Sequence, residues 1–324
     1  MPLPSLGEIR AAQELVYRYM PPTPQYTWPL VNARLGAEVW IKHENTTPVG
    51  AFKLRGGLVY LDDLRRTRPE LAGVAAATRG NFGQGVAMAA RLFGLKAAIV
   101  VPHGNSVEKN RAMRAQGAEL IEEGHDFQAA FEFAQRLAET RGYAFVESFH
   151  ELLVRGTATY ALEFFQGAPS LDSIYVPIGL GSSICGVAAA RNALGLRTEI
   201  VGVTAARAPA YARSFAVGQL IQAPAETEIA DGLAVRRPNA QALEVIRAQV
   251  ARIVEVGEEE IREAMRALYE DTHNVAEGAG AAAMAAAMKE MQALSGKRIG
   301  IVLTGGNVDR AVYAAVLSGA REGA

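Results

Sequence analysis

The stretch "PVGAFKLRGG", residues 48–57, places a lysine between a phenylalanine and a glycine-rich segment that is expected to open a helix. Most lysines are solvated surface charges, and a lysine amine attacks carbonyl groups only when it is deprotonated. Burial near positive charge lowers the pKa of a lysine from about 10.4 toward that condition. Lys53 follows Phe52, and small Gly50 and Ala51 precede that ring, as packing against a flat ligand requires. Lys53 is therefore the candidate reactive group.

Around this segment, short apolar runs alternate with longer amphipathic stretches. After the strand-like "AEVWIKHEN", one regular series starts near residue 73, and a second starts near residue 149 with "SIYVPIG", "TEIVGVTA" and "RIGIVLTGGN" as its strands. Alternation of this kind predicts an α/β fold with parallel sheets covered by helices on both faces. The alanine run at 281–287 is typical of a buried helix in close contact with its neighbours.

Ligands of open parallel sheets bind beyond the carboxyl ends of the strands, so the glycine-rich turns after strands are the candidate sites. The first such turn is "ATRGNFGQGVA", residues 77–87, which runs from a strand end into a helix start. Free backbone N–H groups at a helix start favour an anion, and Thr78 and Asn81 add side-chain donors. This turn can bind a substrate carboxylate, although a capped turn without a ligand fits it equally well.

The second turn is "PIGLGSSICG", residues 177–186. Gly179 and Gly181 allow the backbone to approach a phosphate, and Ser182 and Ser183 can donate to it. A dinucleotide-binding fingerprint fails because Ile184 stands where its third glycine is required. The turn therefore indicates a phosphate on a cofactor other than a dinucleotide.

The third turn is "LTGGN", residues 303–307, in which Thr304 places a neutral hydroxyl at a strand end. Alone it is an ordinary turn. Together, a phosphate-binding turn, a carboxylate-binding turn, a hydroxyl for a ring nitrogen and a reactive lysine describe a site for pyridoxal phosphate and an amino acid.

Composition excludes several other classes of protein. The 324 residues carry 33 basic and 34 acidic side chains, a balance that indicates neither nucleic acid nor an anionic membrane as a partner. The single cysteine, Cys185, forms no intramolecular disulfide and no metal cluster. The first residues lack the pattern of a signal peptide, and no later window is long and apolar enough to span a membrane. These features predict a cytoplasmic protein that binds a small molecule.

The motifs resemble, in order and over essentially the whole chain, those of pyridoxal-phosphate enzymes of the threonine dehydratase and serine racemase family, which has the tryptophan-synthase-β fold. "KHENTTPVGAFKLRGG" is similar to the segment that carries the Schiff-base lysine, and "TRGNFGQGVA" is similar to the loop that binds the substrate carboxylate. "GLGSS" resembles the phosphate loop, and "LTGGNVD" resembles the segment whose first residue bonds the pyridine nitrogen. "IADG" and "AEGAG" resemble segments that bring acidic residues towards the substrate.

The resemblance implies a cofactor in the cleft between two domains, a large one of residues 1–70 and 149–324 and a small one of residues 71–148. It implies catalysis by Lys53 and a homodimer. The implied cofactor contacts are Phe52, Lys53, Asn81, Gly179, Leu180, Gly181, Ser182, Ser183 and Thr304. The implied substrate contacts are Thr78, Arg79, Gly80, Asn81, Asp231 and Glu277, although Asp231 and Glu277 are equally well explained as helix caps.

Several positions depart from the family pattern. Racemases of the family carry a serine just before the Gly-Asn pair, and this chain has Arg79, which stays protonated and is no base. Phe82 replaces the usual histidine, and Leu180 replaces one glycine of the phosphate loop. Some family members bind a divalent cation at positions that correspond to Thr204, Ala208 and Ala210 of this chain. These residues differ from the cation ligands of those members, and we predict no metal there.

The resemblance implies β-elimination of a 3-hydroxy amino acid, first L-threonine or L-serine, to a 2-oxo acid and ammonia. Phenylserine and 3-hydroxyaspartate are alternative substrates, because Arg79 suits a second carboxylate. A racemase or a β-replacement synthase is the alternative within the family. A binding protein without turnover and a nicotinamide-dependent dehydrogenase are the alternatives outside it. His43 and His150 lie near site segments, but structural roles explain them better.

Overall fold

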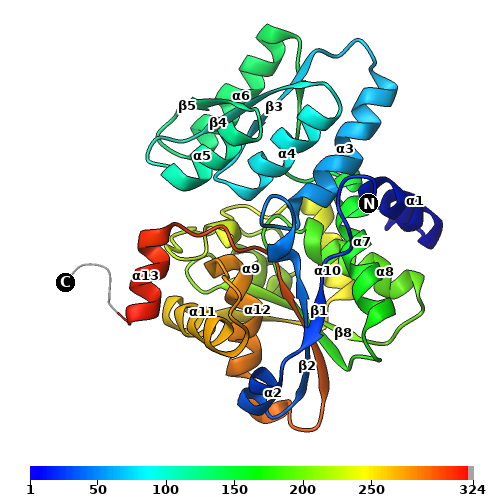
Figure 1. Cartoon of the computed structure of the whole chain (residues 1–324), viewed down its shortest axis with the longest axis vertical. Helices are drawn as coiled ribbons and strands as arrows, with labels where there is room; N and C mark the ends of the chain where they lie inside the picture. Colours follow the sequence, from blue (N-terminus) through cyan, green and yellow to red (C-terminus); the bar gives the residue numbers. More distant parts are fainter. Residues whose placement is uncertain (320–324) are drawn as a thin grey trace.

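The computed structural model describes residues 1–319, which form two separate β-sheets surrounded by helices (Figure 1). The larger sheet has the strand order β1-β2-β10-β7-β8-β9, and every neighbouring pair is parallel except β1 with β2. Its strands are β1 (Gln25–Thr27), β2 (Glu38–His43), β7 (Ser173–Pro177), β8 (Glu199–Ala205), β9 (Arg252–Val256) and β10 (Arg298–Leu303).

The smaller sheet has four parallel strands in the order β5-β4-β3-β6. Its strands are β3 (Gly73–Ala77), β4 (Lys96–Val101), β5 (Glu119–Glu122) and β6 (Ala144–Phe145). The expected fold class, α/β with two open parallel sheets, is confirmed. The smaller sheet is built from the middle of the chain and the larger sheet from both sides of it, while the exact domain limits stay a prediction.

The helices of the described chain connect these strands and cover the sheets (Figure 1). They are α1 (Leu6–Val16), α2 (Pro29–Leu35), α3 (Lys53–Thr67), α4 (Asn81–Leu92), α5 (Val107–Ala115), α6 (Phe127–Arg141), α7 (Glu151–Gly167), α8 (Ser182–Ala193), α9 (Ala210–Val217), α10 (Ala240–Gln249), α11 (Glu258–Thr272), α12 (Gly278–Lys289) and α13 (Arg310–Ser318). Short 3₁₀ turns are η1 (Glu44–Thr46), η2 (Asp231–Leu233) and η3 (Met291–Ala293). None of these helices is both long enough and apolar enough to cross a membrane.

Both faces of each sheet are covered. In β3, Val74 and Ala76 join a hydrophobic cluster with α3 and α4, whereas Ala75 and Ala77 join clusters under α6. In the larger sheet, Ile174 packs with α7 and α8, whereas neighbouring Tyr175 packs with α11 and α12. Successive residues of a strand point to opposite faces, so strands covered on both sides are apolar throughout, as the sequence of these strands is.

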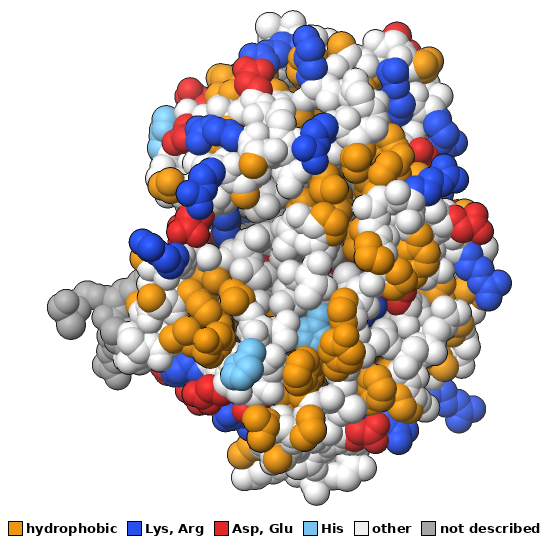
Figure 2. Space-filling view, viewed as in Figure 1, with side chains coloured by type: hydrophobic (Ala, Val, Ile, Leu, Met, Phe, Trp, Pro, Cys, Tyr) orange, Lys and Arg blue, Asp and Glu red, His pale blue; other side chains and the backbone are white. Residues whose placement is uncertain are grey.

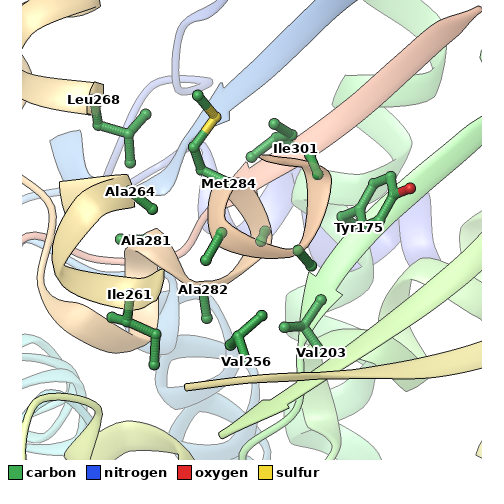
Figure 3. Packing of buried hydrophobic residues seen from close by; sticks show 14 of the residues in the cluster. Tyr175, Val203, Val256, Ile261, Ala264, Leu268, Ala281, Ala282, Met284 and Ile301 are labelled. Atoms are coloured by element: carbon green, nitrogen blue, oxygen red, sulfur yellow. The ribbon is translucent and has the colours of Figure 1, made fainter. Parts of the chain in front are cut away.

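The alanine-rich helix α12 is buried between α11 and the larger sheet, as predicted (Figure 3). Ala281 and Ala282 have no exposed surface and pack with Ala264 of α11 and Val203 of β8. The small side chains let α12 start close to the turn after β10: a Cβ added at Gly280 would lie 2.2 Å from the Gly305 carbonyl oxygen. This approach brings the start of α12 to the ends of the strands.

Several elements differ from expectation. The edge strand β1 runs antiparallel to β2, an arrangement common at the edge of otherwise parallel sheets. The structure also contains strand β9 and helix α10, which the sequence did not lead us to expect. In β9 the apolar run is interrupted by Arg252 and Glu255, which an edge strand tolerates because one of its sides is unpaired.

Candidate active site

One cavity lies where strand ends of both sheets meet. Ala77 ends β3, Pro177 ends β7 and Thr304 follows β10, and all three line it. Its empty volume, open mouth included, is about 930 Å³, which suits a small-molecule site. The predicted site residues in its lining are Phe52, Lys53, Thr78, Arg79, Gly80, Asn81, Gly179, Leu180, Asp231, Glu277 and Thr304. Gly181, Ser182 and Ser183 do not line it and follow Leu180 at the start of α8.

Lys53 is the first residue of α3, and its side chain lies in the cavity wall. Enclosure by protein lowers the pKa of its amine to about 8, although the Glu277 carboxylate opposes that shift. The amine lies 4.7 Å from the centre of the Phe52 ring. A lysine with this pKa is deprotonated in appreciable amount near neutral pH, as a nucleophile or base must be.

The start of α8 forms an anion-binding end beside the cavity. Gly181 precedes the helix with φ at 107°, a left-handed conformation that favours glycine. No side chain of the described residues caps this helix, so its first N–H groups are left for another acceptor. The Ser183 hydroxyl bonds the Tyr160 hydroxyl at 2.6 Å, and Tyr211 donates to the Leu180 carbonyl at 2.8 Å. These tyrosines fix the turn predicted to bind phosphate.

Thr78 organises the second turn. The N–H groups of Gly80 and Gly83 donate to its hydroxyl oxygen at 3.0 and 3.3 Å. Because the oxygen accepts both bonds, the hydroxyl proton remains available to an anion in the cavity. Arg79 is exposed at the edge of the same turn.

Asn81 is held between two residues of the larger unit. Its amide group donates to Glu277 Oε1 at 2.6 Å, and its carbonyl oxygen accepts a bond of 2.8 Å from Asn307. Asn307 also donates to the Val49 carbonyl at 2.8 Å, four residues before Lys53. The side chain predicted to contact cofactor and substrate is therefore fixed by a carboxylate and a second amide.

Glu277 occupies the position before α12 but makes no capping hydrogen bond, and Asp231 starts η2 without one either. The helix-cap explanation therefore fails for both. Glu277 is buried, and its Oε2 atom has no hydrogen-bond partner in the described chain. Burial raises the pKa of Glu277 to about 7, whereas the Lys109 ammonium lowers it.

Lys109 is the charged residue of the cavity lining that was not predicted. It extends from α5 into the cavity, where its Nζ lies 2.5 Å from Asp231 Oδ2 and 3.8 Å from Glu277 Oε2. The segment "VPHGNSVEK" follows β4, so the strand-end rule applied to the fourth strand could have found it. Asn307 has no comparable signal, because only tertiary packing brings it to Asn81.

Both histidines near the site have structural roles. The His43 ring accepts a hydrogen bond from Trp28 at 3.1 Å, and burial lowers its pKa to about 4. The His150 ring accepts the backbone N–H of Leu152 before α7 and stacks on Tyr60 with 4.5 Å between ring centres. Neither lines the cavity.

The donor set fits pyridoxal phosphate. Lys53 supplies an amine with a lowered pKa, the uncapped start of α8 supplies donors for a phosphate, and Thr304 supplies a hydroxyl. The unpartnered Oε2 of Glu277 shows that the polar side of the cavity is incomplete in the protein alone.

Residues 16–305 match the family described as "Pyridoxal-phosphate dependent enzyme", and the chain belongs to that family. Pyridoxal phosphate is therefore its cofactor. An L-threonine ammonia-lyase of Thermotoga maritima is 34% identical over 94% of this chain and 76% of its own length. An L-threo-3-hydroxyaspartate ammonia-lyase of Saccharomyces cerevisiae is 31% identical over 100% of this chain and 99% of its own. The solved structure of maize serine racemase superposes with a TM-score of 0.90 at 28% identity, over 98% of each chain.

Among residues 1–319, no three His, Cys, Asp or Glu side chains are grouped so as to hold a metal ion. At the cation position of some family members, Thr204, Ala208 and Ala210 are buried, and the Thr204 hydroxyl has no partner in the described chain. The lack of a cation there stays a prediction.

Proposed function

We propose that the chain catalyses β-elimination from a 3-hydroxy L-amino acid, first L-threonine or L-serine, releasing a 2-oxo acid and ammonia. The observation that carries the proposal is Lys53, an amine with a pKa of about 8 in the cavity that joins the predicted turns. The ammonia-lyase relatives support the same reaction class.

Each side chain has a role that follows from its position. Pyridoxal phosphate, when bound, supplies the electron sink that makes the substrate Cα proton removable. Lys53 Nζ accepts that proton as general base. Thr78 and the start of α4 hold the substrate carboxylate, the start of α8 holds the phosphate, and Thr304 offers the ring nitrogen a neutral hydroxyl.

Arg79 favours elimination over racemisation. A racemase needs a second group that moves a proton on the face opposite Lys53, and this chain has Arg79 where racemases of the family have a serine. Arg79 is exposed at the cavity edge, and a guanidinium stays charged at every physiological pH. The structural likeness to serine racemase therefore supports the fold and not that activity.

A homodimer is part of the proposal. Hydrophobic side chains gather in several groups on one face of the molecule (Figure 2). Large apolar residues left exposed in the single chain include Tyr26, Leu30, Val217, Leu220, Tyr269 and Val275. Exposed apolar surface of this kind is covered when a second copy binds. A cytoplasmic location and the absence of nucleic-acid partners also remain proposals.

The test compares the purified protein with Lys53→Ala and Lys96→Ala. The wild type and Lys96→Ala, which changes an exposed lysine at the start of β4, should show the visible absorbance of bound cofactor and release ammonia and 2-oxobutanoate from L-threonine. Lys53→Ala should do neither, with a rate at least about a thousandfold lower. Equal turnover by Lys53→Ala would overturn the proposal. A wild type that binds cofactor but yields no ammonia from threonine or serine would overturn the substrate assignment.

A further inference from the structure

The cavity wall formed by α5, η2 and the residue before α12 carries an unbalanced set of charges. Lys109 supplies one cation, and Asp231 and Glu277 supply two carboxylates. The side chains are 10%, 33% and 5% exposed, respectively, so water screens the lysine and Glu277 little. We call these three residues the charged wall. Its net charge is negative when Glu277 is ionised.

The charged wall lies next to the turn proposed to hold the substrate carboxylate. A Cβ added at Gly80 would lie 2.7 Å from Cδ of Lys109, so the lysine stem passes directly along that turn. Asn81, from the same turn, donates to Glu277. A substrate held there by its α-carboxylate would lie beside the ends of these side chains.

We propose that Asp231 determines substrate specificity by forming an ion pair with the Lys109 ammonium. This ion pair excludes substrates with a second carboxylate, so the site accepts 3-hydroxy amino acids with an uncharged β-substituent. The inference rests on the proposed elimination reaction. A β-carboxylate would have to displace Asp231 from Lys109 and would still face Glu277. A methyl group or a hydrogen meets no such repulsion, since like charges placed together in a poorly solvated site are strongly unfavourable.

Arg79, another cationic residue of the cavity lining, does not change this conclusion. It is exposed at the edge, where pairing with a carboxylate contributes little because water and salt screen the charge. The buried Lys109 would pair much more strongly if it were free. Its availability therefore decides the substrate class.

The first test measures kcat/KM for L-threo-3-hydroxyaspartate and for L-threonine. Asp231→Asn keeps the shape of the side chain and removes its charge, so the ratio of the two values should rise about tenfold or more. Asp231→Glu should keep the low ratio of the wild type. In Asp231→Asn/Lys109→Met the gain should disappear, because the freed cation is gone.

Asp309→Asn is the matched control. Asp309 accepts a hydrogen bond from Ser106 at 2.5 Å, next to α5 and α13, and does not line the cavity. The substitution loosens a different contact of α5, to the residue before α13, and leaves the Asp231 carboxylate on Lys109. Its ratio should stay within about twofold of the wild-type ratio.

A binding measurement gives a readout separate from turnover. L-aspartate and L-2-aminobutyrate lack the β-hydroxyl group, and their Kd values can be read from the absorbance of the cofactor-loaded protein. Asp231→Asn should lower the Kd for L-aspartate and leave that for L-2-aminobutyrate nearly unchanged. In the wild type, affinity for L-aspartate relative to L-2-aminobutyrate should rise from pH 8 to pH 6, because Glu277 gains a proton over this range. The groups that face Glu277 are Lys109, Asp231, Lys53 and Asn81.

Unchanged ratios in Asp231→Asn, or a wild type that already prefers the hydroxyaspartate, would overturn the inference. A wild-type aspartate preference that does not change between pH 8 and pH 6 would do so without any variant. If the wild type releases no ammonia from any of these substrates, the proposed function fails, and the two Kd values still test the role of Asp231.

Discussion

Two clusters of largely enclosed charged side chains in the described part of the chain differ in how completely they are paired. One group, the ion network, consists of Lys42, Glu44, Arg55 and Glu163. Arg55 donates to Glu44 at 2.8 Å and to Glu163 at 2.6 Å, and Lys42 donates to Glu163 at 2.6 Å. Two cations face two carboxylates, and every carboxylate oxygen accepts a hydrogen bond.

The second group consists of Lys53 and the charged wall. Here Glu277 Oε2 has no hydrogen-bond partner in the described chain, and Glu277 has a raised pKa of about 7. Enclosure lowers the pKa of Lys53 to about 8. In the ion network burial alone would lower the pKa of Arg55, but the carboxylates of Glu44 and Glu163 outweigh it and raise that pKa.

This difference in pairing distinguishes charged side chains that stabilise the fold from charged side chains that are placed to bind a ligand. Only Leu54 separates Arg55 from Lys53, and desolvation acts on both side chains, but only Arg55 is fully paired. A fully paired network is costly to break, whereas an incomplete one has shifted pKa values near the pH at which an enzyme works. Removing single charges from each group should therefore change stability in opposite directions.

The largest expected effect is in the ion network. Arg55→Met leaves Glu44 and Glu163 without their main partner, and we expect a loss of about 3 to 5 kcal/mol in the free energy of unfolding. The measurement is urea unfolding of the cofactor-free protein at pH 7. Arg66→Ala is the control on the same helix: its side chain is 65% exposed, so its loss should stay below about 1 kcal/mol. A loss below that level in Arg55→Met would contradict the comparison.

The next effect has the opposite sign. The folded-state pKa of Lys53, about 8, lies below its unfolded value of 10.5. Enclosing the ammonium therefore destabilises the folded protein below pH 8. That cost fades between pH 8 and pH 10.5 and is absent above it. Lys53→Met should therefore stabilise the cofactor-free protein at pH 7 by up to about 3 kcal/mol.

Urea unfolding at pH 7 and at pH 10 measures this gain, which should shrink at the higher pH. Lys96→Met, at an exposed position, should change stability little at either pH. If Lys53→Met lowers stability at pH 7, then Lys53 is a paired structural charge like Arg55, and the distinction between the two groups fails.

The parts of the site that could be predicted from sequence are those fixed by local chemistry. Thr78, Gly179 and Thr304 each follow a strand, and the glycines beside them are needed where the backbone turns sharply. The carboxyl ends of parallel strands meet at one edge, so a local pattern was enough to bring these turns together. The buried helix α12 was predictable for a similar reason, since its alanines permit close packing.

The rest depends on packing between distant segments. Lys109 reaches Asp231 across 122 positions of the chain, and Asn307 reaches Asn81 across 226. The strand-end rule marks the segment after β4 as a candidate, but it does not show that Lys109 is the residue of that segment that reaches the cavity. Strand β9 was not predicted because its charged residues interrupt the apolar pattern of a short edge strand. The antiparallel pairing of β1 depends on how the chain returns to the sheet, which the local sequence does not indicate.

The smallest effect concerns Tyr160, which contacts two residues of the predicted cofactor site. Its hydroxyl bonds Ser183 at 2.6 Å and its ring packs against Phe52, with ring centres 6.2 Å apart. Burial raises the pKa of this hydroxyl, so it stays a neutral partner for Ser183. Tyr160→Phe keeps the ring and should cost about 1 kcal/mol of stability. Ser183 loses its orientation, so affinity for pyridoxal phosphate, followed by its absorbance, should fall several-fold.

Tyr175→Phe is the matched control for this last prediction. It removes a hydrogen bond of 2.6 Å, from Tyr175 to Glu290, at a position outside the cavity lining. Its stability should fall by a comparable amount, about 1 to 2 kcal/mol, while affinity for the cofactor stays the same. Equal losses of affinity in both variants would mean that Tyr160 acts only through stability. A loss confined to Tyr160→Phe would show that the Tyr160 hydroxyl positions Ser183 for the cofactor.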